Sequence, residues 1–486
     1  MGGGLMQLVA YGAQDIYLTG NPQITFFKVV YRRHTNFAME TVAQTFSGSA
    51  GPDKTVVATI SRNGDLVGRM CVTSATASKT GGSDLVQSAE VEIGGQKIDK
   101  QTAEWMQIWN ELSTPDSRAV GLKAMTGDIG TTGSDGVTTV QVPLQFWFNR
   151  NPGLALPLIA LQYHEVKVKV VLGDSTTGAA NAQLDADYIY LDTDERRRFA
   201  QVSHEYLIEQ VQEETAKGSS SSNTLNFNHP VKELIWTNEG TNYTDAKLVL
   251  NGHDRFAAQP AEYFQLRQPM NHHTAVPSQN LPTAAKATAN NVHTLLVSAL
   301  GVVGVYDATE DLATNTFKSL SAADTLSAAD AAGSRKFVQL AEEQVGAIAV
   351  GQVHLVNHTV GATGARVATV AKVTSVSAAG TGGAKSIGYD VDIHSGTAST
   401  ADDTLVIHKI GDAGCRTSKM TKKINCYSFA LKPEEHQPSG TCNFSRIDNA
   451  QLVTTGTQLA SSDKIYAVNY NVLRVMSGMG GLAYSN

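Results

Sequence analysis

An all-β fold built from sandwiches or jelly rolls is predicted for this chain of 486 residues. Short runs of β-branched or alternating residues, such as Val56–Ser61 and Val166–Leu172, recur between turn residues and are typical of strands. Glycine contributes 43 residues, a share of about 9% against an average near 7%, which favours many turns. Stretches with helical periodicity are few. Many short strands with few helices are typical of two-sheet architectures.

The composition indicates a large folded protein without a cationic surface. Charged residues make up 17% of the chain, against about 25% in an average protein, and this argues against disorder. The 38 basic and 45 acidic residues give a net charge of −7, which disfavours a protein whose main role is to bind nucleic acid. At about 150 residues per unit, the length corresponds to roughly three compact units.

Neither the amino terminus nor the cysteines indicate membrane insertion or export. The first residues lack the basic start and apolar run of a signal peptide, and Met6 stands where a myristoylation signal has Ser or Thr. No run of about 18 apolar residues is present, so we expect no transmembrane helix. The four cysteines are too sparse for a disulfide scaffold and form no CxxC pair, so we expect reduced thiols in an intracellular protein and no structural zinc. They are Cys71, Cys415, Cys426 and Cys442.

Three turn dipeptides separate predicted strands. Asn63-Gly64, Gly94-Gly95 and Asn251-Gly252 are of the kind that hairpins use. Val91–Ile93 precedes the second of them and Lys247–Leu250 the third, which predicts a hairpin at each.

Two helices are predicted. Thr102–Leu112 is the stronger, because four apolar residues fall on one face and Pro115 ends the pattern. Those four residues are Trp105, Ile108, Trp109 and Leu112. A shorter helix is predicted at Asp194–Gln201, ahead of a strand at Glu205–Val211.

A change of composition near the middle divides the chain. Residues 212–224 contain a Gly/Ser run and are predicted to be a flexible linker. Similar blocks stand on either side of it: Ala103–Ile108 follows a Gly turn, as does Ala261–Leu266. A second pair compares the aromatic strands predicted at Leu144–Phe148 and Tyr427–Leu431. These repeats favour two similar β domains.

Residues 278–423 have a different composition, dominated by Ala, Thr, Gly, Val and Ser. One interpretation is a long disordered loop. We favour an inserted, surface-displayed β subdomain, because several apolar strand-like runs are available for burial and long insertions close at little entropic cost. Those runs are Leu295–Tyr306, Val345–Val356 and Thr404–Ile410, and Ala362–Val376 shows strand-like alternation with small side chains.

No spacing of residues indicates catalysis, a cofactor or a metal. His204-Glu205 lacks a second histidine, because Ile208 occupies that position. His272-His273 are adjacent, so they would point to opposite faces of a strand, and we expect contacts with solvent or a neighbouring subunit. The chain has no GxSxG elbow, and Gly380–Lys385 lacks the spacing of a phosphate-binding loop. We therefore predict that the protein is not an enzyme.

Two further patterns are explained without a specific binding or modification function. Arg196–Arg198 follows Asp192, Asp194 and Glu195, which favours structural salt bridges over nucleic-acid contact. The sequon N-x-S/T occurs three times, and its asparagines are weak candidates for glycosylation, since such triplets also arise by chance. They are Asn242, Asn357 and Asn443.

Several long blocks resemble one family, the major capsid proteins of large icosahedral nucleocytoplasmic DNA viruses, most of all those of algal viruses. The blocks are Leu8–Ala38, Ser61–Leu66, Ile93–Lys100, Val142–Val166, Tyr190–Gln210, Tyr427–Ala450 and Val468–Val475. The resemblance covers residues 1–277 and 424–486. It does not extend to the segment between them.

The resemblance implies a double jelly roll of two tandem eight-stranded sandwiches. The expected organisation is an amino-terminal arm at 1–24, a first jelly roll at 25–211, the linker at 212–224 and a second jelly roll at 225–486 that carries the 278–423 insertion. It also implies a homotrimer forming a pseudo-hexagonal capsomer, which tiles an icosahedral shell over an internal membrane.

The partners that the resemblance implies are further copies of the chain, neighbouring capsomers, and minor capsid and penton proteins, with the internal membrane nearby and no direct nucleic-acid contact. We expect assembly in the host cytoplasm and, through the insertion, contact with the host surface. The alternatives are a paralogous or minor capsid component, or a β-rich carbohydrate-binding adhesin.

Overall fold

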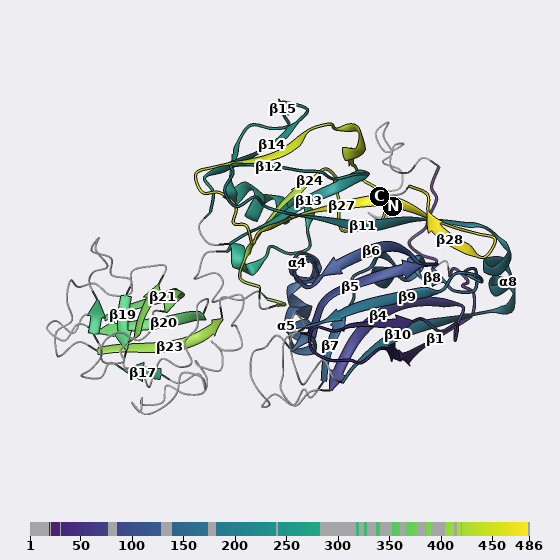
Figure 1. Cartoon of the computed structure of the whole chain (residues 1–486), viewed down its shortest axis with the longest axis horizontal. Coiled ribbons are helices and arrows are strands. Elements are labelled where there is room, and N and C mark those ends of the chain that lie inside the picture. Colours follow the sequence, from purple (N-terminus) through teal and green to yellow (C-terminus); the bar gives the residue numbers. More distant parts are fainter. Residues whose placement is uncertain are drawn as a thin grey trace, which may run out of the picture.

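The computed structural model describes residues 19, 21–29, 31–75, 85–127, 139–173, 181–239, 242–281, 416–418 and 420–484, together with strands between 317 and 412. The fold is all-β, as predicted, and its main body consists of two sandwiches stacked one above the other (Figure 1). Once the two-residue strands are set aside, each sandwich has eight strands, which is the predicted double jelly roll.

The first sandwich packs two five-stranded sheets face to face. One sheet has the order β1-β10-β4-β7 with β8 beside β4, and the other has the order β2-β3-β9-β5-β6. Their bounds are β1 Phe37–Gln44, β2 Phe46–Ser47, β3 Thr55–Thr59, β4 Leu66–Ala75, β5 Val86–Ile93, β6 Gln96–Thr102, β7 Thr139–Pro143, β8 Leu156–Pro157, β9 Val166–Leu172 and β10 Ala182–Leu191.

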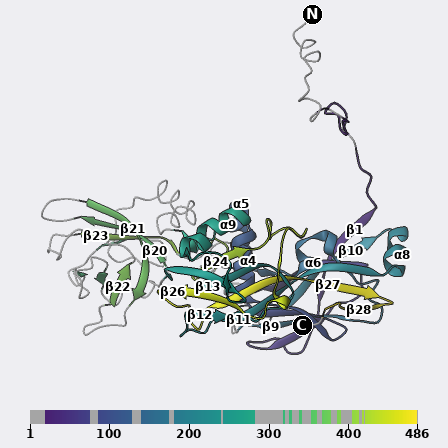
Figure 2. The same ribbon diagram turned by 90° about the horizontal axis from the view of Figure 1, so that it is seen from above.

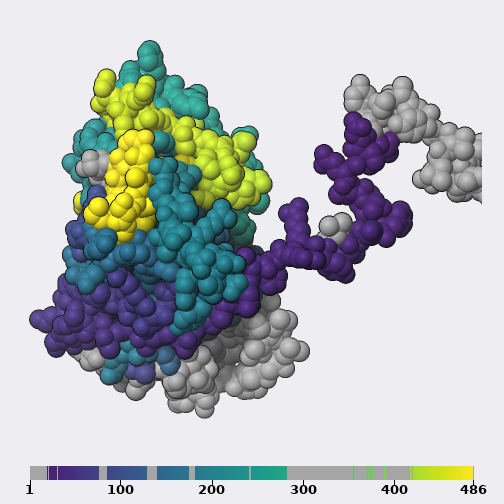
Figure 3. Space-filling view, turned by 90° about the vertical axis from the view of Figure 1, so that its right-hand side faces the viewer, coloured from purple at the N-terminus to yellow at the C-terminus, as the bar shows by residue number. Residues whose placement is uncertain are grey.

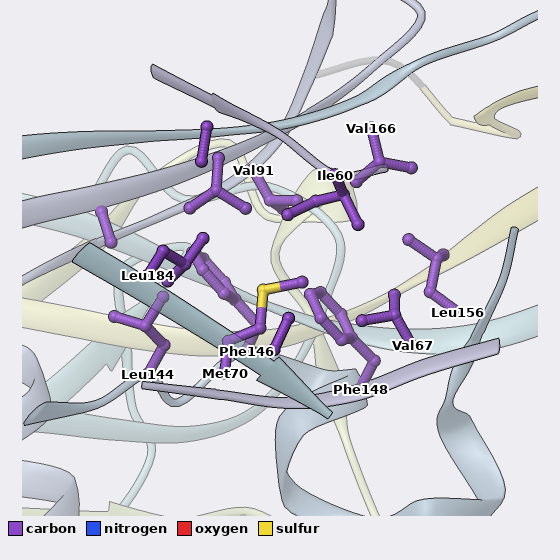
Figure 4. Packing of buried hydrophobic residues seen from close by; sticks show 14 of the residues in the cluster. Ile60, Val67, Met70, Val91, Leu144, Phe146, Phe148, Leu156, Val166 and Leu184 are labelled. Atoms are coloured by element: carbon purple, nitrogen blue, oxygen red, sulfur yellow. The ribbon is translucent and has the colours of Figure 1, made fainter. Parts of the chain in front are cut away.

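Alternation builds the core of this sandwich. In β9, residues with even numbers from Val166 to Leu172 are buried and the intervening ones are half-exposed, as the sequence pattern predicts. Met70 and Leu184 of one sheet meet Val91 of the other in the centre of the sandwich, together with Phe146 and Phe148 (Figure 4). Burial of this kind contributes about 25 cal/mol per Å² of apolar surface.

Among the described residues, four α-helices accompany the first sandwich. In α4, Ala103–Ser113, the hydroxyl of Thr102 accepts a hydrogen bond from the Trp105 amide and caps the helix, and the predicted apolar face is buried. The second predicted helix is α8, Thr193–Gln201. Sequence reasoning missed α5, Asp116–Thr126, because it has little apolar periodicity. The predicted aromatic strand at Leu144–Phe148 is wrong, since this segment leads into α6, Trp147–Arg150.

The second sandwich pairs a six-stranded sheet with a five-stranded one. Their orders are β11-β27-β13-β24, with β25 and β28 at its sides, and β12-β26-β14-β15, with β16 beside β14. Their bounds are β11 His204–Thr215, β12 Ser222–Thr224, β13 Pro230–Asn238, β14 Asp245–Leu250, β15 His253–Asp254, β16 Gln259–Pro260, β24 Lys423–Ser428, β25 Cys442–Asn443, β26 Ala450–Thr455, β27 Lys464–Met476 and β28 Met479–Leu482.

The change from one sandwich to the other comes earlier in the chain than the linker predicted at 212–224. The whole of β11 pairs antiparallel with β27, from His204 opposite Val475 to Thr215 opposite Lys464. Residues 204–211 therefore lie in a sheet of the second sandwich, and the first four residues of the predicted linker are strand. Composition concealed this, because Gln212–Thr215 is polar although its backbone is fully paired.

The repeated blocks have matching structures. Gly94-Gly95 turns β5 into β6 ahead of α4, and Asn251-Gly252 turns β14 into β15 ahead of a π-helical turn at Tyr263–Arg267 and α9, Gln268–His272. Asn63-Gly64 differs from the prediction, because it joins strands of opposite sheets and forms no hairpin. A Cβ on Gly64 would lie 2.9 Å from Tyr188 Cβ, so close packing accounts for this glycine.

The inserted segment contains a seven-stranded sheet of order β17-β23-β20-β21-β22-β19-β18, which agrees with a β-rich subdomain (Figure 1). The strands are β17 Phe317–Ser319, β18 Thr325–Ser327, β19 Phe337–Leu340, β20 Gln352–Thr359, β21 Arg366–Val376, β22 Lys385–Tyr389 and β23 Thr404–Asp412. The predicted strand at Leu295–Tyr306 lies outside the described residues.

Both ends of the predicted insertion are buried in the main body. Asn280 Nδ2 donates to the Gln265 and Ile424 carbonyls at 2.8 and 2.7 Å. On the other side, Thr417 donates through its amide and its hydroxyl to the buried Glu111 of α4, at 2.7 and 2.6 Å. The predicted bounds of 278 and 423 are therefore too wide, because Asn280 is bonded to the second sandwich and Thr417 to α4 of the first.

The amino-terminal arm leaves the body beside β1, β10 and α8 and extends away from it (Figure 2). In the space-filling view the arm stands clear of the globular part (Figure 3). Residues 31–36 are exposed and precede β1, which begins at Phe37, so the segment outside the sandwich extends beyond the predicted limit of residue 24. Among the helices of the described residues, none has the length and hydropathy needed to cross a membrane.

Candidate functional site

In the described part of the chain, the junction between the two sandwiches combines a buried apolar contact with buried charged groups. The sheet β11-β27-β13-β24 covers the second core with one face and receives α4 on the other. Trp105 and Trp109 of α4 pack against Ile235 of β13 in this second contact, and the Trp105 and Tyr466 rings lie 5.2 Å apart. The apolar face that predicted a helix therefore joins two domains.

Charged residues are buried beside this apolar contact. Arg150 Nη1, from α6 of the first sandwich, lies 3.0 Å from Glu209 Oε2 of β11, and Lys232 Nζ of β13 lies 2.7 Å from Glu209 Oε1. The Arg150 guanidinium also stacks over the Trp109 ring at 4.0 Å. Lys232 is fully buried and Glu209 is 6% exposed, so the group is shielded from water.

Glu209 is held in its ionised form by these partners. Burial alone would raise the pKa of its carboxyl, but the Lys232 ammonium, His436 and Arg150 outweigh burial and lower the pKa to about 2. Burial lowers the pKa of Arg150 and of Lys232, against the opposing effect of Glu209. Glu209 therefore links a cation of the first sandwich to a cation of the second.

His273 forms a second buried bridge. Its Nε2 lies 3.0 Å from Glu233 Oε2 and its Nδ1 lies 3.0 Å from Glu434 Oε1, with the imidazole fully buried. Burial lowers the pKa of His273, but Glu233, Cys426 and Glu434 together raise it well above the ordinary value. The prediction that this histidine faces solvent or another subunit is wrong, because His273 follows a short helix that directs it inward.

Asp99 connects the sandwiches through the backbone. Its Oδ1 accepts a hydrogen bond from the Val211 amide of β11 at 3.1 Å, and its Oδ2 accepts one from Gln101 Nε2 at 3.0 Å. Burial raises the pKa of Asp99 to about 6, although both hydrogen bonds and Arg150 favour ionisation. Gln210 adds a hydrogen bond from its Nε2 to the Ile98 carbonyl in the same seam.

The carboxy-terminal hairpin holds the opposite edge of the junction. Tyr163 donates its amide to the Gly478 carbonyl at 2.9 Å, and His164 Nδ1 lies 2.9 Å from the Gly480 carbonyl. A Cβ on Gly480 would lie 2.6 Å from Leu161 Cδ2 and 3.1 Å from Ile93 Cγ2, so a side chain at this position would have to displace its neighbours. β28 thereby clasps the first sandwich.

A cavity of about 550 Å³ opens beside the ionic group and is lined by Trp147, Arg150, Glu209, Glu434 and His436. Its acidic and basic groups are already paired with one another, which suits a structural role. Within the part of the chain that the structure describes, no cluster of three or more His, Cys, Asp or Glu side chains could hold a metal ion. The arrangement fixes one sandwich against the other.

The three sequon asparagines lie in different structural environments. Asn443 is exposed, but its Oδ1 caps a short helix by accepting from the Ser445 amide at 3.1 Å. Asn242 is half-buried, and its Oδ1 accepts from Gln265 Nε2 at 3.0 Å. Asn357 lies on β20, and its side chain is outside the described residues. Glycosylation at all three positions stays a prediction.

Other predicted features have structural roles. Arg196 forms an ion pair from its Nε to Asp65 Oδ1 at 2.8 Å, which confirms a structural salt bridge but assigns it a distant partner. Cys71, Cys426 and Cys442 are free thiols, and Cys415 lies outside the described residues. Sequence reasoning missed Lys232 and Glu233, which stand next to each other in a strand where charges ordinarily indicate a solvent face.

Comparisons with known proteins agree with this architecture over almost the whole chain. A family model described as the major capsid protein N-terminus matches residues 25–192. A second, described as the large eukaryotic DNA virus major capsid protein, matches residues 195–247 and 416–481 and omits the inserted segment.

Individual relatives are similar along their full lengths. The major capsid protein of Pyramimonas orientalis virus is 46% identical, and that of Paramecium bursaria Chlorella virus 1 is 36% identical, with 100% of both chains covered in each comparison. A quasi-atomic model of the PBCV-1 virus capsid superposes with a TM-score of 0.58 at 30% identity, covering 95% of this chain and 100% of that one.

Proposed function

Because this chain belongs to the major capsid protein family of large eukaryotic DNA viruses, and is therefore a structural component of the virion capsid, we propose that it assembles as a homotrimeric, pseudo-hexagonal capsomer. The observation that carries the proposal is the full-length similarity together with two sandwiches fixed by a buried junction. Three such chains would place six jelly rolls in one ring. Closed rings of identical subunits are the usual outcome of self-association.

The rigid junction supports a tiling role. A capsomer keeps a flat, hexagonal outline only if its two sandwiches hold a constant angle, and the contacts of Glu209 with Arg150, of Asp99 with Val211 and of the β28 hairpin with Tyr163 each resist hinge motion. The low content of charged residues also suits a subunit whose surface meets many neighbours, because interface cores are depleted of charge. We propose no catalytic step, since the family is a structural one.

We further propose which partners the peripheral segments contact. The arm, beginning with residues 1–24, would contact minor capsid proteins or the internal viral membrane beneath the shell. Neighbouring capsomers and penton proteins would meet the sides of the sandwiches. The inserted β-rich segment would face outward and be available to the host surface. Assembly would take place in the host cytoplasm.

The mass of the purified protein in solution tests the central proposal. A trimer has about 155 kDa, three times the chain mass of 51.7 kDa, and should appear as hexagonal particles in electron micrographs. A stable monomer would refute the capsomer. A monomer that binds immobilised glycans would favour the alternative of a carbohydrate-binding adhesin.

Two experiments test the peripheral segments. Deleting residues 2–20 should leave the trimer intact and impair shell assembly; loss of the soluble trimer would contradict the assignment of the arm. Antibodies raised against residues 282–415 should label intact virions, and absence of labelling would contradict outward display. Counting copies per virion by mass spectrometry separates a principal shell protein from a paralogous or minor component.

A further inference from the structure

The described part of the arm carries an unusual combination of side chains. Five large apolar residues between positions 24 and 31 are 70–98% exposed. They are Ile24, Phe26, Phe27, Val29 and Tyr31. Single exposed apolar side chains are common on protein surfaces, but a contiguous group of them is not. Such a group therefore marks an interaction site.

The same segment is basic in a chain that is acidic overall. Residues 21–34 contain Lys28, Arg32 and Arg33 and neither Asp nor Glu. Their formal charge of +3 leaves −10 for the rest of the chain, given a total of −7. The arm is thus attracted electrostatically to the body of any copy of this protein.

A groove of matching chemistry lies at the base of the arm. It has a volume of about 730 Å³, and Thr35 at the end of the arm lies on its rim. Its walls combine apolar groups with acidic ones, and Arg198 and His204 also contribute. The apolar residues are Leu66, Phe199 and Tyr206, and the acidic ones are Asp194, Glu195 and Glu205.

One acceptor in this groove lacks a donor. Glu195 Oε2 is buried and accepts no hydrogen bond from the residues that the structure describes. Glu205 already pairs with Arg474 at 2.8 Å, and His204 Nε2 is engaged with the Phe199 carbonyl at 2.8 Å. A guanidinium entering the groove would satisfy Glu195, because arginine matches a carboxylate with charge and with hydrogen bonds.

The path of the chain favours a groove on another copy. In the described part of the arm, the hydrogen bonds of residues 21–34 are local: the Phe27 amide donates to Thr25 Oγ1, and His34 Nδ1 meets the Thr35 carbonyl. No Gly or Pro stands between Tyr31 and Phe37 to reverse the chain, and the arm runs outward from α8 (Figure 2). Residues 24–34 span up to about 36 Å when extended, enough to reach a neighbour.

We propose that residues 24–34 of one copy dock in the acidic groove between α8 and β11 of a neighbouring copy, so that the subunits exchange arms. The aromatic side chains would cover Phe199 and Tyr206, while Arg32 and Arg33 would face Asp194 and Glu195. Residues before 20 would remain free for the contacts proposed beneath the shell. The inference rests on the proposed capsomer only because that assembly supplies the neighbouring copies.

Disulfide trapping between two tagged chains tests the exchange. One chain carries Tyr31→Cys and the other Gly153→Cys, which places a thiol at the groove. Mixed capsomers, or shells assembled from them, should yield an oxidised species containing both tags. A chain without added cysteines and a pair using Gly121→Cys, in open space on α5, are the controls and should not cross-link.

Charge reversal gives a second, independent measurement. Arg32→Glu with Arg33→Glu should reduce the cross-link yield at least about tenfold, and Asp194→Lys with Glu195→Lys on the groove chain should restore it. The surface variant Lys167→Glu is the matched control and should leave the yield unchanged.

Three outcomes would overturn arm exchange. They are a cross-link only within a single chain that carries both cysteines, no cross-link in a confirmed trimer or shell, and vesicle binding without cross-linking. In the last case, the full chain would bind vesicles of anionic phospholipid and lose that binding on Arg32→Glu with Arg33→Glu. A monomer in solution would instead refute the proposed capsomer, so the two failures are distinguishable.

Discussion

Lys232 Nζ lies 2.7 Å from Glu209 Oε1, and neither side chain is more than 6% exposed. Glu209 belongs to β11 and Lys232 to β13, with β27 between them in the sheet. The pair therefore spans three strands on the face that meets the first sandwich, where Arg150 completes it from α6. Buried charges of this kind hold a geometry firmly, because separating them leaves an unpaired ion in a dry environment.

Replacing Lys232 with Met should destabilise the protein by about 3–5 kcal/mol, because Glu209 would lose its closest cation while remaining buried. Chemical denaturation of the purified protein measures this change. The control is Lys432→Met: this lysine is 67% exposed in its ion pair with Glu435, so its loss should cost no more than about 0.5 kcal/mol. Equal effects of the two substitutions would contradict the role of the buried pair.

The stability of the protein should rise as the pH falls from 8 to about 5. Asp99 has a pKa of about 6 in the folded protein, above its ordinary value of 3.8, so its protonated form favours folding. This contribution is complete below about 3.8 and is lost as the pH rises through about 6. The raised pKa of His273 acts in the same direction, because its contribution is complete below the ordinary value of 6.5 and is lost as the pH rises through the folded value.

At still lower pH the trend should reverse. The pKa values of Glu209 and Glu434 are lowered, so their stabilisation is present above the ordinary value of 4.5 and is lost as the pH falls toward the folded value, about 2 for Glu209. Thermal melts between pH 3 and pH 8 measure both the gain in stability as the pH falls to about 5 and the loss of stability below it.

The variant Asp99→Asn tests how much of the stability change between pH 5 and pH 8 comes from Asp99. It should remove about 1.4 kcal/mol of the stability difference between pH 5 and pH 8, since pH 5 lies one unit below the folded pKa of about 6 and the amide does not titrate. The exposed Asp448→Asn is the control and should keep the profile of the unmodified protein. An unchanged profile in Asp99→Asn would assign the pH dependence to other groups.

Removing residues 282–415 and joining the ends with a Gly/Ser linker should leave the two sandwiches folded. Asn280 and Thr417 on either side of the excised segment make their hydrogen bonds within the main body, and the matching family model omits the segment. The melting temperature of the shortened chain, and its mass in solution compared with that of the full chain, measure this. As a contrast, excising 278–423 removes both anchors and should abolish soluble expression.

Gly480→Val should push the carboxy-terminal hairpin off the first sandwich and cost about 1–3 kcal/mol, because its side chain would overlap Leu161 and Ile93. Differential scanning calorimetry provides the measurement. Gly121→Ala, which meets nothing within 4 Å, is the matched control and should stabilise α5 by about 0.5–1 kcal/mol. A neutral Gly480→Val would show that β28 does not clasp the first sandwich.

The sequence predicted features whose information is local. The apolar face of Thr102–Leu112 and the alternation in Val166–Leu172 depend on spacing within one element, and both were confirmed. The repeated Ala103 and Ala261 blocks also pointed correctly to two similar domains. Long shared blocks indicated the family, which the comparisons confirmed.

The junction could not be predicted in the same way. Glu209 meets Lys232 and Arg150 only because strands distant in sequence share one face, and each charge by itself resembles a solvent-facing residue. His273 was misplaced for the same reason, since its partners Glu233 and Glu434 are remote along the chain. The groove beside α8 likewise depends on elements that only the fold brings together.

The central place of β27 has a consequence for biosynthesis. This strand, residues 464–476, lies between β11 and β13, so its partners emerge from the ribosome more than 200 residues before it does. Until β27 has been synthesised, β11 and β13 lack their common neighbour, and the hairpin that joins β27 to β28 cannot contact the first sandwich. Pairing over such separations is slow. A nascent chain therefore cannot complete the second sandwich until β27 has been made, which ties the folding of this domain to the late synthesis of one strand.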